Sequence, residues 1–388
     1  MLDVSQPRGG MDWGEGLKDY EICSSQACGN AEHDRMKFFA PSLFVIASAT
    51  GSLLSAEKHK AWTLASEVFA AAKPAKTDHS PESMVAAAEA FLEKLTPEQR
   101  KQALLTLDHP ERQKWTNTPP RGTEGGLRLG DLDKAQLEAA SVLLSTVMST
   151  EGYLMSRNIM LADDLLLDSR EEAEERGGFG AANYWVAIFG KPSVENEWAV
   201  QFDGHHVGVN LTVSGEKVTM SPSFIGTQPH EFKLGDEVIV PMGKETSLAY
   251  EFIDSLSEEQ KEEAIRGDKR RRIMVGPGND GKTLDIPGMS CKGLTAEQRE
   301  KLLKLVSCWV DDLPKACAEQ RMSEIKAGLD QAVFTWNGPF ALESDMSFHI
   351  SGPTVIIEYA GQDLGGDPLD HLHSIYRDPT NEYGAKWK

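Results

Sequence analysis

The stretch YWVAIFGKPSVENEWAVQFDGHHVGVNLTVSGEKVTM, residues 184–220, decides the fold class. β-Branched and aromatic residues dominate four short segments, at 184–189, 198–202, 205–213 and 217–220. Gly-Lys-Pro, Asp-Gly and Ser-Gly separate these segments. This pattern predicts consecutive β-strands joined by tight turns.

Helices are predicted before these strands, and the same order returns later in the chain. Apolar residues recur at helical spacing in the segments 57–72, 81–95, 133–148 and 150–167. Further helices are predicted at 245–267, 295–311 and 314–331, and further strands at 332–336, 346–351, 354–359 and 371–377. Helices, strands, helices and strands in this order predict an α+β fold.

The two parts also resemble each other in sequence. FLEKLTPEQR at 91–100 matches FIDSLSEEQK at 252–261, and both contain a helix start. We therefore predict two similar helix-then-sheet halves, 57–232 and 233–388, related by duplication, with a site between their β-rich parts. Recurrence of helix-capping sequences for purely local reasons is the alternative.

Charge restricts the partners. The chain has 388 residues and a formal net charge of −20. Such a field repels phosphate backbones and anionic membrane surfaces, so we expect no nucleic-acid partner. A small molecule is the expected substrate.

The first 56 residues are interpreted separately. Residues 36–56 combine a basic start, a short apolar run and small residues, as secretory signal peptides do. If translation starts at Met36, residues 1–35 are a non-native or disordered extension. The mature protein is then periplasmic or extracellular, with no stable membrane insertion after cleavage. A buried N-terminal helix is the alternative.

Histidines give the main indication of chemistry. His206, His349, His371 and His373 all fall in predicted strands. Side chains alternate between the faces of a strand, so His371 and His373 share one face with Arg377. In the strand from 205, His206 is expected on the polar face. Imidazoles at this spacing are typical of a metal or acid–base site.

We therefore predict His206, His371, His373 and His349 as metal ligands. Glu358 is predicted as the general base or as an alternative fourth ligand, and Arg377 as an anchor for an anionic substrate group. Copper, iron and zinc all suit such ligands. Acid–base catalysis without metal, and histidines that only satisfy one another, remain open.

Two other motifs are interpreted as structural. Residues 276–283 match the letters of a phosphate-binding loop, but Pro287-Gly288 leaves no room for the helix that would hold the phosphates. Asp163 and Asp164 are adjacent on a predicted helix, and we expect them on its solvated face.

Several segments together resemble a bacterial domain-of-unknown-function family, number 3500. They are Gln201–His206, Ile350–Pro353 with Ile357–Tyr359, and His371–Pro379 with Glu382–Gly384. The resemblance covers most of 57–384. It implies that 204–206 and 371–378 are signature segments, but it implies no activity.

The sequence thus predicts an exported metalloenzyme that acts on a small anionic substrate. Redox chemistry is slightly favoured over hydrolysis, because histidine ligands without an adjacent HExxH base suit copper or iron as well as zinc. The alternative is a non-catalytic exported protein that binds a metal or small molecule. A third interpretation is a purely structural role.

Overall fold

The computed structural model describes residues 63–119, 125–169, 178–341, 344–363 and 366–387. The predicted extension 1–35 and signal peptide 36–56 lie outside them. Among the described residues, no helix combines the length and apolar character needed to cross a membrane.

The first half contains helices α1 to α5 and strands β1 to β6. The helices are α1 Leu64–Ala71, α2 Pro81–Lys94, α3 Pro97–Ala103, α4 Lys134–Val147 and α5 Thr150–Ser169. The strands are β1 Leu104–Leu105, β2 Leu127–Arg128, β3 Tyr184–Phe189, β4 Trp198–Gly204, β5 Val207–Ser214 and β6 Lys217–Thr227.

The second half contains helices α7 to α10 and strands β7 to β13. The helices are α7 Gly243–Asp254, α8 Glu258–Ala264, α9 Ala296–Val310 and α10 Lys315–Gly328. The strands are β7 Phe232–Leu234, β8 Glu237–Ile239, β9 Met289–Ser290, β10 Val333–Asn337, β11 Ser347–Ser351, β12 Ile356–Gly361 and β13 Leu372–Arg377. The helix expected at 245–267 is two helices, because Ser257 caps a new one with Gln260 in a capping box.

The fold is α+β, as predicted. One sheet of 11 strands runs in the order β1-β3-β4-β5-β6-β13-β12-β11-β10-β9, with β2 beside β3. The two halves meet where β6 pairs antiparallel with β13. A separate two-stranded sheet pairs β7 with β8.

Equivalent hydrogen bonds occur in both halves. Gln136 donates to the carbonyl of Lys94 (3.0 Å) and to Gln99 (2.8 Å). Gln298 donates in the same way to the carbonyl of Ser255 (2.8 Å) and to Gln260 (2.8 Å). Duplication itself stays a prediction.

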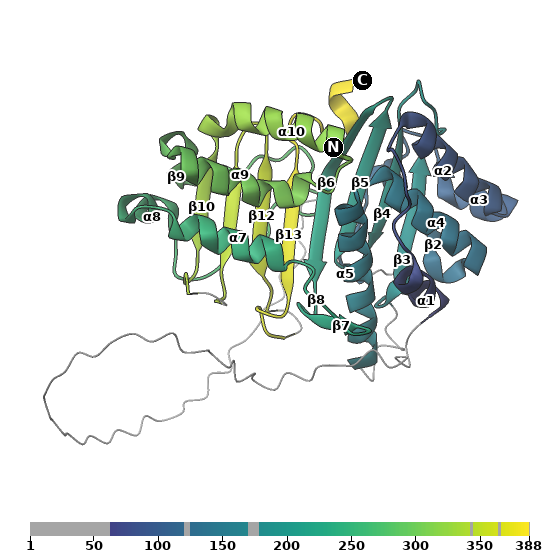
Figure 1. Cartoon of the computed structure of the whole chain (residues 1–388), viewed down its shortest axis with the longest axis horizontal. Coiled ribbons are helices and arrows are strands. Elements are labelled where there is room, and N and C mark those ends of the chain that lie inside the picture. The colour runs from purple at the N-terminus through teal and green to yellow at the C-terminus, as the bar shows by residue number, and fades with distance from the viewer. Residues whose placement is uncertain (1–62, 120–124, 170–177, 342–343, 364–365, 388) are drawn as a thin grey trace, which may run out of the picture. The chain divides into compact units, whose positions relative to one another are not determined.

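The sheet has two differently covered faces. Helices cover the face seen in front in Figure 1. Trp309 of α9 donates to Ser374 there (3.0 Å), and Arg321 of α10 donates to Tyr376 (2.8 Å). Loop residues cover the opposite face, where the backbone of Val275 contacts Arg377 (2.8 Å). No helix begins directly after 276–283, since residues 283–288 are without helix or strand, so the phosphate-loop lookalike is a loop, as expected.

Candidate metal centre

His206 lies in a hairpin turn. The strand predicted to start at His205 starts instead at Val207, and His205-His206 connect β4 to β5. Gly204 and Val207 pair across the turn, which leaves a two-residue loop. His206 has a φ of +67°, in the left-handed region. The expected alternation of faces from His205 was therefore wrong, and the turn sets the direction of His206.

His371 and His373 lie at the start of β13. His373 pairs with Gly226 of β6, and a Cβ at Gly226 would lie 2.8 Å from Cδ2 of His373 and 3.2 Å from Cδ2 of His206. The glycine therefore leaves the space in which the two rings meet. The i, i+2 spacing brings His371 beside His373, as the strand pattern predicts.

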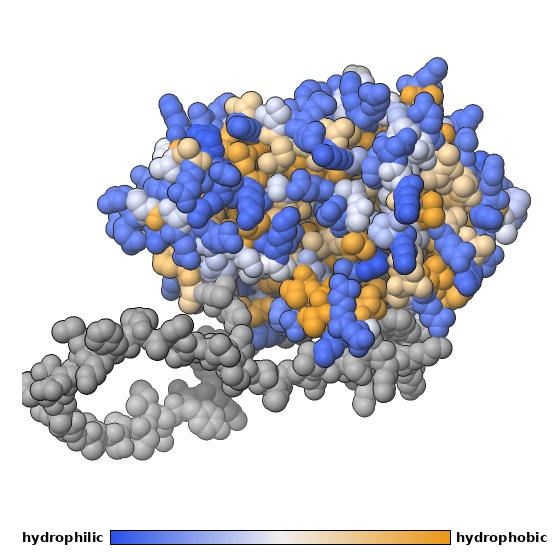
Figure 2. Space-filling model, viewed as in Figure 1, coloured by the Kyte–Doolittle hydropathy of each residue, from blue (hydrophilic) through white to orange (hydrophobic). Residues whose placement is uncertain are grey.

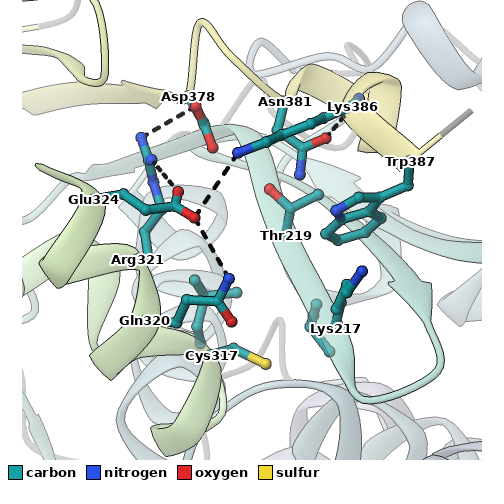
Figure 3. A pocket seen from close by; sticks show the side chains of 12 residues that line it. Lys217, Thr219, Cys317, Gln320, Arg321, Glu324, Asp378, Asn381, Lys386 and Trp387 are labelled. Atoms are coloured by element: carbon teal, nitrogen blue, oxygen red, sulfur yellow. Dashed lines mark hydrogen bonds and ion pairs between the residues drawn. The ribbon is translucent and has the colours of Figure 1, made fainter.

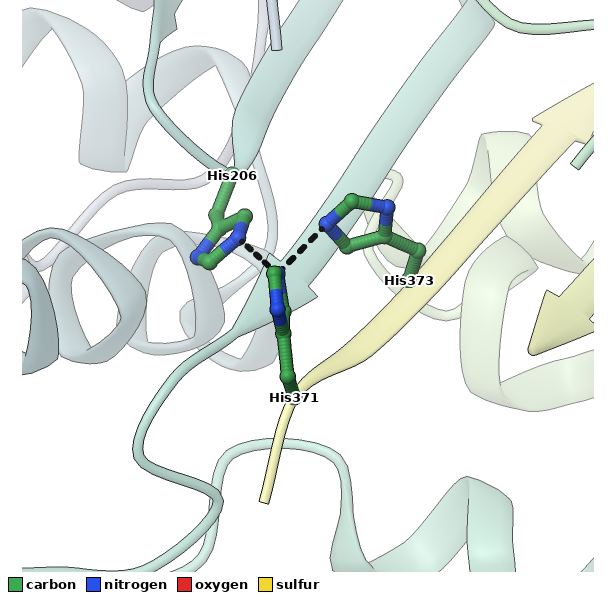
Figure 4. Close-up of side chains that lie close together, drawn as sticks. All are labelled: His206, His371 and His373. Atoms are coloured by element: carbon green, nitrogen blue, oxygen red, sulfur yellow. Dashed lines mark hydrogen bonds between the residues drawn. The ribbon is translucent and has the colours of Figure 1, made fainter. Parts of the chain in front are cut away.

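The three rings converge through their Nε2 atoms (Figure 4). Nε2 of His371 lies 2.8 Å from Nε2 of His206 and 3.0 Å from Nε2 of His373. One ligand atom from each residue lies within 4.8 Å of the others, so this group can hold a metal ion. His206 and His371 are buried, and His373 is partly buried.

The spacings of 2.8 and 3.0 Å are close to those of neighbouring ligands on one metal ion. Two nitrogens about 2.1 Å from one metal are about 3.4 Å apart in a tetrahedron and about 3.0 Å apart along an octahedral cis edge. A neutral imidazole nitrogen carries either one proton or one lone pair. Nε2 of His371 can therefore form a good hydrogen bond with Nε2 of His206 or with that of His373, but not with both. A cation, in contrast, accepts a lone pair from each of the three nitrogens.

Electrostatics keeps one of the ligands neutral. Burial lowers the pKa of His373 well below its ordinary value, and the adjacent His371 and His205 lower it further. Its lone pair is then available at neutral pH, as metal binding requires.

His205 and Asp163 extend the centre and were missed. His205 stacks on His206 with ring centroids 3.6 Å apart, and its Nδ1 lies 2.6 Å from the carboxylate of Asp163. Asp163 also accepts from the amide of Gly180 (2.7 Å). Asp163 and Asp164 are fully buried, so the expectation of a solvated face was wrong. Apolar neighbours on both sides of the two acids were the available signal.

His349 and Glu358 form a different contact. They pair across β11 and β12, with His349 Nε2 3.3 Å from the Glu358 carboxylate. Glu358 also accepts from the amides of Met274 (2.9 Å) and Val275 (2.7 Å). Among the described residues, the group of ligand atoms that can hold a metal does not include His349. Glu358 instead fixes the loop.

Arg377 also holds the loop. Its side chain is fully buried and donates to the carbonyls of Val275 (2.8 Å) and Gly276 (3.1 Å). It donates as well to Asp280 (3.0 Å) and Glu382 (2.6 Å). These contacts occupy both guanidinium ends.

Asp378, at the end of the His371–Asp378 segment, belongs to a network of ion pairs. Asp378 pairs with Arg321 (3.1 Å) at the edge of a cavity of about 240 Å³ (Figure 3). Arg321 pairs with Glu324 too (3.1 Å), and Lys386 lies 3.9 Å from Glu324. These four charges neutralise one another, and Lys217 is the one other charged residue among the described residues of the lining.

Comparison with protein families shows which family the chain belongs to. The model of the family described as "Protein of unknown function (DUF3500)" matches residues 77–385. The chain belongs to this family. As a DUF3500 protein it gains no assigned chemistry from its relatives. Comparison with curated proteins and with solved structures gives no match.

Proposed function

We propose that this DUF3500 protein is a metalloenzyme whose metal ion is bound by His206, His371 and His373. The observation that carries the proposal is the convergence of three Nε2 atoms, at 2.8 and 3.0 Å from the central one. Copper, iron and zinc are the candidate metals, since all accept imidazole. When bound, such an ion polarises a carbonyl, activates water or supports redox chemistry.

The number of protein ligands favours catalysis. Three histidines are the only such group among the described residues, and a catalytic metal characteristically keeps a position for water or substrate. The competing function is capture of a metal without catalysis, for which a closed shell is expected. Redox chemistry stays part of the proposal, because no carboxylate belongs to the ligand group to act as a hydrolytic base beside the ion.

A small anionic molecule remains the proposed substrate. The positive charge of the ion itself would attract this anion. Arg377 does not supply the attraction, because its donors are engaged by the loop and by Asp280 and Glu382. We also propose export, on the basis of residues 36–56.

Elemental analysis of protein purified without a His tag tests the metal. We expect about one ion per chain, and its loss in the double variant His371→Ala, His373→Ala. The matched control is His109→Ala, His230→Ala, which removes two histidines outside the ligand group and should keep the ion. A control variant that loses the metal equally, or no metal in any sample after reconstitution, contradicts the proposal.

Azide binding separates catalysis from capture. The cobalt-substituted protein should change its visible spectrum when azide is added, because an open position accepts the anion. An unchanged spectrum at saturating azide would favour the closed shell of a capture protein.

A further inference from the structure

A groove of about 780 Å³ separates α5 from the ends of α7, α9 and α10. Side chains from both halves of the chain line it. The groove shares no lining residue with the histidine cluster. An inference about it therefore does not depend on the proposed metal.

One wall of the groove is apolar and accessible. Val238 and Val240 are 48% and 42% exposed, although both are large apolar side chains. Figure 2 shows hydrophobic surface in this region, around β7 and β8. Leu154 and Met155 of α5 and Met322 of α10 continue the wall. Such a surface favours an apolar chain in contact with it.

Two buried acids line the same groove. Glu245 is 1% exposed and Asp312 is 6% exposed. Oε2 of Glu245 is buried and has no hydrogen-bond partner among the described residues. Burial raises the pKa of Glu245 to about 7, and burial together with Glu245 raises that of Asp312 well above its usual range. An unsatisfied buried carboxyl group is costly unless a cation or a proton compensates it.

Among the groove's other charges, Lys244 lowers the pKa of both acids, but it forms no ion pair with them. Its other carboxylates are Glu151, Glu237, Asp311 and Glu319, and its amines are Lys244 and Lys315. Among the described residues, neither amine lies within ion-pair distance of Glu245 or Asp312; Lys315 pairs instead with Glu319 (3.9 Å). The groove is therefore acidic overall, with an apolar wall next to its buried carboxyl groups.

We propose that this groove binds a primary alkylammonium ion, with the ammonium group at Glu245 and Asp312 and the alkyl chain along the valine–methionine wall. An ammonium group offers three donors and one positive charge, which match the unpartnered oxygen and the excess of acid. A carboxylate amphiphile has neither the positive charge nor the hydrogen-bond donors. Quaternary ammonium has the charge but no donor.

Isothermal titration with n-octylammonium, on the full chain at pH 8, tests the proposal. We expect saturable binding to the wild-type protein, about tenfold weaker binding of octyltrimethylammonium and no binding of octanoate. Methylammonium should bind much more weakly, because it lacks the chain. Octanoate binding as tightly as octylammonium, or no octylammonium binding, would overturn the proposal.

Variants locate the site. Glu245→Gln and Asp312→Asn should each weaken octylammonium binding about tenfold or more, since the charge is removed with little change of shape. Met322→Lys places a positive charge on the partly exposed wall and should also weaken octylammonium binding. Because Met322 is not buried, this variant still tests the site if Glu245→Gln or Asp312→Asn fails to fold. Glu300→Gln, on the exposed surface of α9, is the control. Wild-type affinity in all three groove variants would refute the assignment.

Discussion

Gly226→Ala is predicted to loosen the metal centre without removing a ligand. The new Cβ would lie 2.8 Å from Cδ2 of His373 and 2.8 Å from the carbonyl oxygen of Leu372. Ordinary contact begins at 3.4 Å, so the His373 ring or the strand must move by 3.4 − 2.8 = 0.6 Å. The imidazole can turn away from the new Cβ, but the contact with the carbonyl oxygen of Leu372 is relieved only if the backbone of β13 shifts against β6, so we expect both the ring and the strand to move.

The expected cost has two parts. Overpacking a buried site destabilises proteins by about 1–3 kcal/mol. Disturbing the support of a metal ligand typically costs about 10–100-fold in metal affinity. A chelator competition titration measures the affinity, and urea unfolding of the metal-free protein measures the stability.

Gly293→Ala is the matched control. A Cβ there meets nothing within 4 Å, and the residue has no positive φ. It should retain both wild-type values. Wild-type metal affinity in Gly226→Ala would refute the account of how the two strands bring His206 and His373 together.

Three further predictions concern the surroundings of the two sites. His349→Ala should retain the metal, because this ring lies outside the ligand group; loss of the ion would make His349 a ligand after all. Asp163→Asn should lower metal affinity about tenfold, because the carboxylate orients His205, which stacks on a ligand; unchanged affinity would contradict that role. Between pH 4.5 and about 7, unfolded Glu245 releases its proton while the folded protein keeps it. Its contribution to stability therefore falls as pH rises, by about 3 kcal/mol in total, and Glu245→Gln should remove this slope in urea unfolding; an identical slope in the variant would argue against it.

Sequence patterns predicted the regular parts of this fold well. Tyr184–Phe189 was predicted as a strand with the observed ends, because glycine and asparagine border an apolar β-branched run. The helix predicted at 150–167 is α5, which starts at Thr150 as predicted and ends at Ser169, two residues later than predicted. Local propensity and burial agree in these elements, so the pattern alone was sufficient.

The histidine cluster was predicted in part. The i, i+2 spacing of His371 and His373 requires only the geometry of a strand, and the structure brings both rings together. Their meeting with His206 depends on the pairing of β6 with β13, which is a contact between residues far apart in sequence. Spacing within one segment carries no information about such a pairing.

The predicted catalytic residues Glu358 and Arg377 have a structural contact that the sequence did not indicate. Glu358 and Arg377 are buried and hydrogen-bonded to the backbone of residues 274–276. In the sequence, a buried charged residue that stabilises a loop looks like a catalytic one, because both are charged side chains in an apolar strand. The loop contacts become visible only in the structure, and the catalytic role of the two residues stays a prediction.

X-ray absorption of the reconstituted protein measures the central claim most directly, because it counts the imidazoles bound to the ion. The account predicts three imidazole nitrogens and at least one exchangeable light ligand, at distances of about 2.0–2.2 Å. It further predicts two imidazoles in His206→Ala. A spectrum of fully hydrated metal, or an imidazole count that His206→Ala leaves unchanged, would contradict it.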